Sequence, residues 1–127
     1  MRVLVVDDER PCLDELAYLL SKQHGMEIAG VFTSPSKALE ALADLKPDAA
    51  FLDLSMPHMN GAELAKKMIA QMPDIKIVFA TAYGKELQKL SDSPAAGSIL
   101  KPVCEAKLKD LLLQVEAQMR FVDDASG

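Results

Sequence analysis

Five short apolar runs, separated by longer stretches with helical periodicity, constrain the fold of this chain more than any other feature. The runs occupy residues 3–6, 27–32, 49–52, 75–80 and 98–100. Each run is short enough to be a strand that is buried on both faces, as strands of a parallel sheet are. The alternation of such runs with helical segments therefore indicates repeated βα units.

The segments between the runs have apolar residues at every third or fourth position, which is the spacing of an amphipathic helix. Three apolar stripes are clear: Leu13, Leu16, Ala17 and Leu20; Leu64, Ala65, Met68 and Met72; and Leu108, Leu111, Leu112, Val115 and Met119. Pro11 suits the first turn of the first helix, and Ser34 followed by Pro35 suits the start of the second. Residues 85–91 are the weakest candidate helix. Five βα units of this length predict a doubly wound parallel sheet with helices on both faces.

The composition is that of one acidic domain. The chain has 127 residues, half of them apolar, so a single well-filled core is feasible. Its net charge is −5 and no dense basic run appears, which argues against direct nucleic-acid binding by this segment. The apolar stretch at the N-terminus is too short for a signal peptide or a membrane span. We expect a cytoplasmic domain without membrane contact, in which Cys12 and Cys104 are reduced thiols.

Polar residues follow four of the five apolar runs. They are Asp7, Asp8 and Glu9 after the first run, Asp53 after the third, Thr81 after the fourth, and Lys101 and Pro102 after the fifth. Because a doubly wound sheet gathers the carboxyl ends of its strands at one edge, these side chains should converge. Converging carboxylates repel one another unless a cation lies between them. Mg²⁺, with Mn²⁺ as a substitute, is the kind of hard ion that suits carboxylates, waters and phosphate oxygens.

These side chains also form a candidate site for phosphoryl transfer. Asp53 is the expected nucleophile, and its attack would form an aspartyl phosphate. Asp8 and Asp53 would hold the metal, while Asp7 would orient a metal-bound water. Thr81 and Lys101 would hold the transferred group, because a hydroxyl and an ammonium stabilise the charge on its equatorial oxygens.

Four motifs together resemble the receiver domain of response regulators in two-component signalling. They are Val5-Val6-Asp7-Asp8-Glu9, Asp53-Leu54-Ser55-Met56-Pro57 with Met59-Asn60-Gly61, Thr81-Ala82, and Lys101-Pro102. The resemblance covers residues 1–119 and implies a single flavodoxin-like α/β domain, (βα)5, with strand order 2-1-3-4-5; residues 120–127 would be a tail or the start of a linker. It also implies that the backbone carbonyl of Ser55 is a further ligand to Mg²⁺, and that the Lys101–Pro102 peptide bond is cis.

The resemblance further implies a partner and a cycle. The phosphoryl group would come from the phosphohistidine of a sensor histidine kinase or a histidine phosphotransfer protein. Phosphorylation would shift the surface of the fourth helix, fifth strand and fifth helix, control an output and allow a homodimer to form. The domain would catalyse its own phosphorylation and slow dephosphorylation without being a classical enzyme. The segments 8–11 and 81–83 are reminiscent of receivers fused to LytTR DNA-binding domains.

One position departs from the receiver pattern. Receivers usually carry an aromatic residue three positions before the lysine, and here that position is Ser98. Tyr83, two residues after Thr81, is the candidate to take over part of the switching role. We therefore expect the output to run through a rearrangement of residues 84–97 more than through an aromatic rotamer flip.

Other classes of function are weighed against this one. The missing aromatic residue leaves open a receiver-like docking module that takes no phosphoryl group. A flavodoxin-like cofactor binder would share the topology, but its phosphate-binding loop needs glycines and hydroxyls where residues 7–11 carry acidic side chains. A phosphatase with a covalent aspartate would be expected to carry a second aspartate two residues after Asp53, where Ser55 stands.

Overall fold

The computed structural model describes residues 1–82 and 95–126 and contains one parallel sheet. Its strands, in the order β2-β1-β3-β4-β5, are β1 (Arg2–Val6), β2 (Glu27–Phe32), β3 (Ala49–Asp53), β4 (Lys76–Thr81) and β5 (Gly97–Leu100). The helices in the described ranges are α1 (Arg10–Ser21), α2 (Pro35–Leu45), α3 (Gly61–Gln71) and α5 (Glu105–Ser126). The predicted α/β fold, with its flavodoxin-like strand order 2-1-3-4-5, is confirmed.

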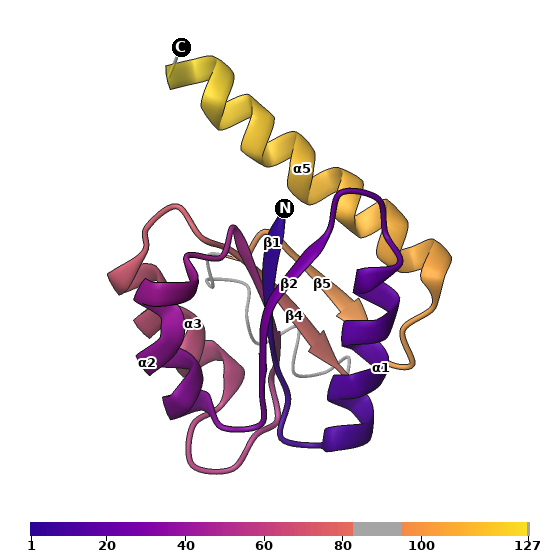
Figure 1. Cartoon of the computed structure of the whole chain (residues 1–127), viewed down its shortest axis with the longest axis vertical. Helices are drawn as coiled ribbons and strands as arrows, with labels where there is room; N and C mark the ends of the chain where they lie inside the picture. The colour runs from indigo at the N-terminus through magenta and orange to yellow at the C-terminus, as the bar shows by residue number, and fades with distance from the viewer. Residues whose placement is uncertain (83–94, 127) are drawn as a thin grey trace.

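The sheet lies between two layers of helices. Figure 1 shows α1 and α5 on one face of the sheet and α2 and α3 on the other. Successive strand residues point to opposite faces, so Val3 and Val5 of β1 pack in the core beneath α1 and α5. Leu4 and Val6 pack in the second core, beneath α2 and α3. Because both faces are covered, the strands read as continuous apolar runs rather than as alternating ones.

The helices pack through the stripes that the sequence predicts. Leu13, Leu16 and Leu20 of α1 are buried, as are Leu64, Ala65 and Met68 of α3 and Leu108, Leu111, Leu112 and Val115 of α5. The starts of two helices carry side-chain caps. The Ser34 hydroxyl accepts a hydrogen bond from the Lys37 backbone N–H at 3.4 Å, and Asn60 Oδ1 accepts one from the Glu63 N–H at 2.9 Å. These caps satisfy backbone donors that the first helical turn leaves without an intrahelical partner.

Each of the five strands begins and ends within one residue of its predicted run. The weak helix predicted at residues 85–91 lies outside the described residues. Residues 120–126, expected as a tail or linker, continue α5, while the domain boundary at residue 119 stays a prediction. Within the described ranges, no helix combines the length and the apolar character needed to cross a membrane.

Candidate functional site

The carboxyl ends of β1, β3, β4 and β5 bring the predicted site residues to one edge of the sheet. Asp53 and Thr81 are the last residues of β3 and β4. Asp7 directly follows β1, and its N–H donates to the Phe32 carbonyl at 3.1 Å. Lys101 directly follows β5, and its N–H donates to the Thr81 carbonyl at 2.8 Å. Inter-strand hydrogen bonds thus continue one residue beyond β1 and β5, and they hold in place the backbone from which these side chains project.

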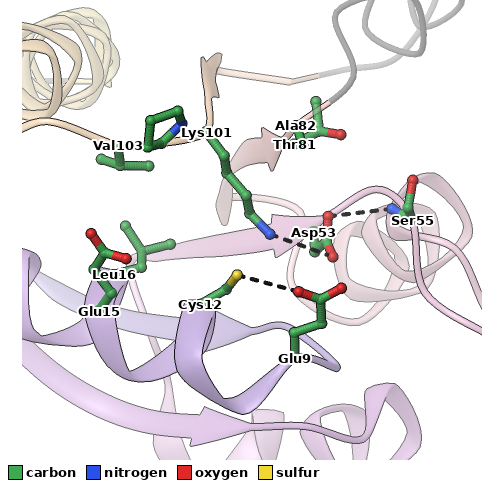
Figure 2. A pocket seen from close by; sticks show the side chains of 11 residues that line it. Glu9, Cys12, Glu15, Leu16, Asp53, Ser55, Thr81, Ala82, Lys101 and Val103 are labelled. Carbon is green, nitrogen blue, oxygen red and sulfur yellow. Dashed lines mark hydrogen bonds and ion pairs between the residues drawn. The ribbon is translucent and has the colours of Figure 1, made fainter.

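Lys101 connects the acidic residues of the site. Its Nζ atom donates to Asp7 Oδ2 at 2.7 Å and lies 3.6 Å from Asp53 Oδ2. Figure 2 shows the lysine side chain reaching from the end of β5 across to Asp53 at the end of β3. Asp7 and Asp53 are 2% and 6% exposed. Charges removed this far from water need a partner, and Lys101 provides one for both carboxylates.

The surroundings of Asp53 and Lys101 shift the pKa values of these two groups. Burial and then the charge of Asp7 raise the pKa of Asp53 to about 6, although Lys101 and the Ser55 N–H favour its ionised form. Burial alone would lower the pKa of Lys101, but the hydrogen bond to Asp7 and the charges of Asp7 and Asp53 leave it raised. The lysine is therefore held as an ammonium, while Asp53 ionises less readily than an ordinary aspartate.

The acidic residues fit a hard divalent cation. Asp7, Asp8 and Asp53 each offer a carboxylate oxygen, and these atoms lie within 4.8 Å of one another. Oxygen ligands about 2.1 Å from one Mg²⁺ ion are at most about 4.2 Å apart, so a small contraction would suffice. Asp8 Oδ1 is buried and has no hydrogen-bond partner among the described residues. A buried oxygen that accepts no hydrogen bond is available as a ligand for a metal ion.

The loop after β3 is held close to Asp53. The Ser55 N–H donates to Asp53 Oδ1 at 3.3 Å, and the Gly61 N–H donates to the Leu54 carbonyl at 3.1 Å. A Cβ at Gly61 would collide with the Asp53 carbonyl oxygen and lie 3.0 Å from Leu54 Cα. Backbone atoms cannot move aside as a flexible side chain can, so only glycine lets α3 begin this close to the end of β3.

A pocket of about 390 Å³ opens at this edge of the sheet. Asp53, Ser55, Thr81, Lys101 and Pro102 line it, together with Ala82 and Val103. The Lys101–Pro102 peptide bond is cis. Thr81 is fully buried beside Asp53 and Lys101, whereas Ser98 is exposed on β5 and lines a separate hollow against α5. Tyr83 and most of the predicted switch segment 84–97 lie outside the described residues.

The same pocket is lined by the N-cap residue of α1 and by α1 residues to which the sequence analysis gave no role in the site. Glu9, Cys12, Glu15 and Leu16 form this wall. The Cys12 thiol donates to Glu9 Oε2 at 3.5 Å, and burial followed by that hydrogen bond keeps the pKa of the thiol raised despite the nearby Lys101. Glu9, Cys12 and Leu16 follow one another at spacings of three and four residues, which puts them on the same side of the start of α1. This spacing is the sequence signal that could have predicted their common position at the pocket.

Comparison with known proteins identifies the family. The family model described as the response regulator receiver domain matches residues 3–113. The chain is 38% identical over 131 aligned positions to the sensory transduction protein LytT of Bacillus anthracis, covering all of this chain and 53% of that protein. It is 35% identical to an uncharacterized response regulatory protein of Yersinia pestis, over 94% of this chain and 50% of that one. The chain thus spans about half the length of these relatives.

A solved structure agrees with these relatives. The response regulatory domain of protein mrkE from Klebsiella pneumoniae superposes with a TM-score of 0.81 at 33% identity. The match covers 93% of this chain and 97% of that one, so the similarity extends over the whole domain.

Proposed function

The chain belongs to the response regulator receiver domain family, and from this premise we propose that Asp53 accepts a phosphoryl group from a phosphohistidine in a Mg²⁺-dependent reaction. Receiver domains of this family are signalling modules of two-component systems rather than classical enzymes. The observation that carries the proposal is the contact of Lys101 with both Asp7 and Asp53 at the carboxyl edge of the sheet, where Asp53 and Lys101 line one pocket.

The proposed transfer begins at a carboxylate oxygen of Asp53. That oxygen attacks phosphorus, the P–N bond of the phosphohistidine breaks, and the bonding electrons leave with the imidazole. The Ser55 N–H, 3.3 Å from Asp53 Oδ1, holds one carboxylate oxygen so that the other can attack. Lys101 exchanges part of its contact with Asp53 for the equatorial oxygens of the arriving group, and the Thr81 hydroxyl holds another of these oxygens.

The acidic residues have a separate role in the proposal. Asp8 and Asp53 would hold the metal together with the backbone carbonyl of Ser55, and Asp7, which anchors Lys101, would orient a water at the ion. When bound there, Mg²⁺ supplies positive charge that offsets the crowded carboxylates and the transferring oxygens. Mn²⁺ would supply the same charge to the same ligands.

The phosphoryl donor that we propose is a sensor histidine kinase or a histidine phosphotransfer protein in the cytoplasm. Phosphorylation at Asp53 would pull on Thr81, shift the surface that includes β5 and α5, and favour a homodimer. With Ser98 in place of the usual aromatic residue, the segment 84–97 with Tyr83 would carry most of this shift. Relatives about twice as long suggest that residues 1–119 are the receiver part of a longer protein, and we propose a LytTR DNA-binding domain as its output.

Intact-protein mass spectrometry tests the phosphorylation proposal. The native chain is incubated with phosphoramidate or acetyl phosphate, with Mg²⁺ or with EDTA, beside the variants Asp53→Asn and Asp44→Asn. Asp44 is an exposed carboxylate of α2 and serves as the matched control. We expect a gain of one phosphoryl group that requires both the metal and Asp53. No gain with either donor would instead favour a docking module that works without phosphorylation.

A further inference from the structure

The wall of the pocket formed by α1 is acidic at its rim. Glu9 and Glu15 are exposed side chains that line the pocket, whereas Asp53 lies buried at its floor. Figure 2 shows the Glu9 carboxylate directed toward Asp53 and the Glu15 carboxylate further along α1, toward Val103. A phosphoryl donor bound in this pocket would therefore lie in the field of two exposed carboxylates.

Positive charge at the pocket is already engaged. Among the described residues that line it, Lys101 is the single basic one, and it is paired with both Asp7 and Asp53. Arg10 also lies in the first turn of α1, but it does not line the pocket and its guanidinium lies 3.5 Å from Asp14. Within the described part of the chain, neither Glu9 nor Glu15 forms a salt bridge with a basic side chain.

We propose that Glu9 and Glu15 select the phosphoryl donor by charge. They disfavour donors that carry two uncompensated negative charges, relative to donors with a positive charge beside the phosphoryl group. This inference rests on the proposed phosphorylation of Asp53 and names the donor chemistry that the pocket prefers. A phosphohistidine flanked by cationic side chains meets that preference, because those side chains would face the two glutamates.

Two small donors separate the effect of charge from the chemistry of transfer. Acetyl phosphate is a dianion at neutral pH, and its P–O bond breaks with acetate leaving. Phosphoramidate carries one net negative charge, because its nitrogen is protonated, and its P–N bond breaks with ammonia leaving. In both reactions Asp53 attacks the same phosphorus with the same metal requirement. The ratio of the two rate constants therefore cancels any change in metal affinity or in the reactivity of Asp53.

The experiment measures this ratio, acetyl phosphate over phosphoramidate, from the time course of the intact-protein mass. We expect Glu9→Gln and Glu15→Gln each to raise the ratio about threefold, the factor for one unit charge at about 7 Å in water. The matched control Glu40→Gln, an exposed glutamate of α2, should leave it unchanged. The rise should vanish at about 1 M salt, where the screening length is about 3 Å.

Three results would overturn the inference, and they are distinguishable. A ratio that stays at the native value in both glutamine variants, while Asp53 is phosphorylated by both donors, would reject charge selection and leave the proposed function standing. A rise that persists at high salt would attribute the change to pocket shape rather than charge, and would also reject the inference. Failure of both donors to modify native Asp53 would overturn the proposed function together with the inference that rests on it.

Discussion

At the scale of single residues, the site brings buried carboxylates close together, an arrangement that is unfavourable for the stability of the fold. Asp53 is buried and lies beside Asp7, and among the described residues Lys101 alone offsets the two. Its pKa, raised to about 6, means that the folded chain disfavours the ionised carboxylate. The contribution of Asp53 to stability should therefore fall as the pH rises from about 4, where this group ionises in the unfolded chain, to about 6, and that loss should persist at higher pH.

Replacing this carboxylate by an amide should stabilise the metal-free protein. We expect Asp53→Asn to increase the free energy of unfolding at pH 7.5 in EDTA by about 1–2 kcal/mol, because it removes a desolvated charge and its repulsion from Asp7. Urea denaturation followed by circular dichroism measures the difference. The exposed control Asp44→Asn should change stability by less than about 0.5 kcal/mol. A destabilised Asp53→Asn protein would show that the pairing with Lys101 outweighs the cost of burial.

At the scale of elements, helix starts place the loops around the site. α3 begins at Gly61, whose N–H is bonded to the Leu54 carbonyl, directly behind Asp53. Asn60 caps this helix through a 2.9 Å hydrogen bond, whereas the Ser34 cap of α2 is longer, at 3.4 Å. Short cap hydrogen bonds contribute more than long ones because their strength falls off with distance.

The two caps should therefore differ in their contribution to stability. We expect Asn60→Ala to lower the free energy of unfolding by about 1 kcal/mol and Ser34→Ala by about 0.5 kcal/mol. Denaturant melts of both variants, analysed with a common slope, provide the comparison. Equal losses, or a larger loss for Ser34→Ala, would contradict the ranking by cap geometry.

At the scale of the whole molecule, the site lies where the connections leave the sheet in opposite directions. From β1 the chain passes through α1 to β2 on one side, and β3 lies on the other side of β1. Such a switch point opens a crevice at the carboxyl ends of the strands, and the candidate metal ligands directly follow β1 or end β3 on either side of it. An ion bound there would tie together strands that are far apart in sequence.

Mg²⁺ should accordingly stabilise the entire domain. At a free concentration ten times its Kd, the ion should raise the free energy of unfolding by about 1.4 kcal/mol, because it binds only the folded chain. Thermal melts across a Mg²⁺ titration measure the effect as a rise in Tm. Asp8→Asn, which removes the charge on the carboxylate with the unpartnered buried oxygen, should need a much higher concentration for the same rise. An unchanged titration in this variant would place the ion elsewhere.

Much of the fold was predictable because a strand that is buried on both faces is recognisable in the sequence as a short apolar run. A strand covered by helices on each side must be apolar at every position, and β1 and β3 show this as uninterrupted runs. The candidate acidic and basic residues were equally visible, since each directly follows or ends a strand. Boundaries differed by a residue where pairing continues one step beyond the apolar run, as it does for Thr81 and Gly97.

The order of elements, the apolar faces and the presence of Asp7, Asp53 and Lys101 at strand ends can be read from the sequence, because they depend on local periodicity and chain order. The distances between those side chains, the closer contact of Lys101 with Asp7 than with Asp53, and the position of Glu9 and Glu15 at the same pocket depend on the tertiary fold. Distances and pocket walls depend on how α1 packs against the sheet and on the loop after β5. That packing brings together residues that are nearly a hundred positions apart in the sequence, and local sequence patterns do not predict such contacts.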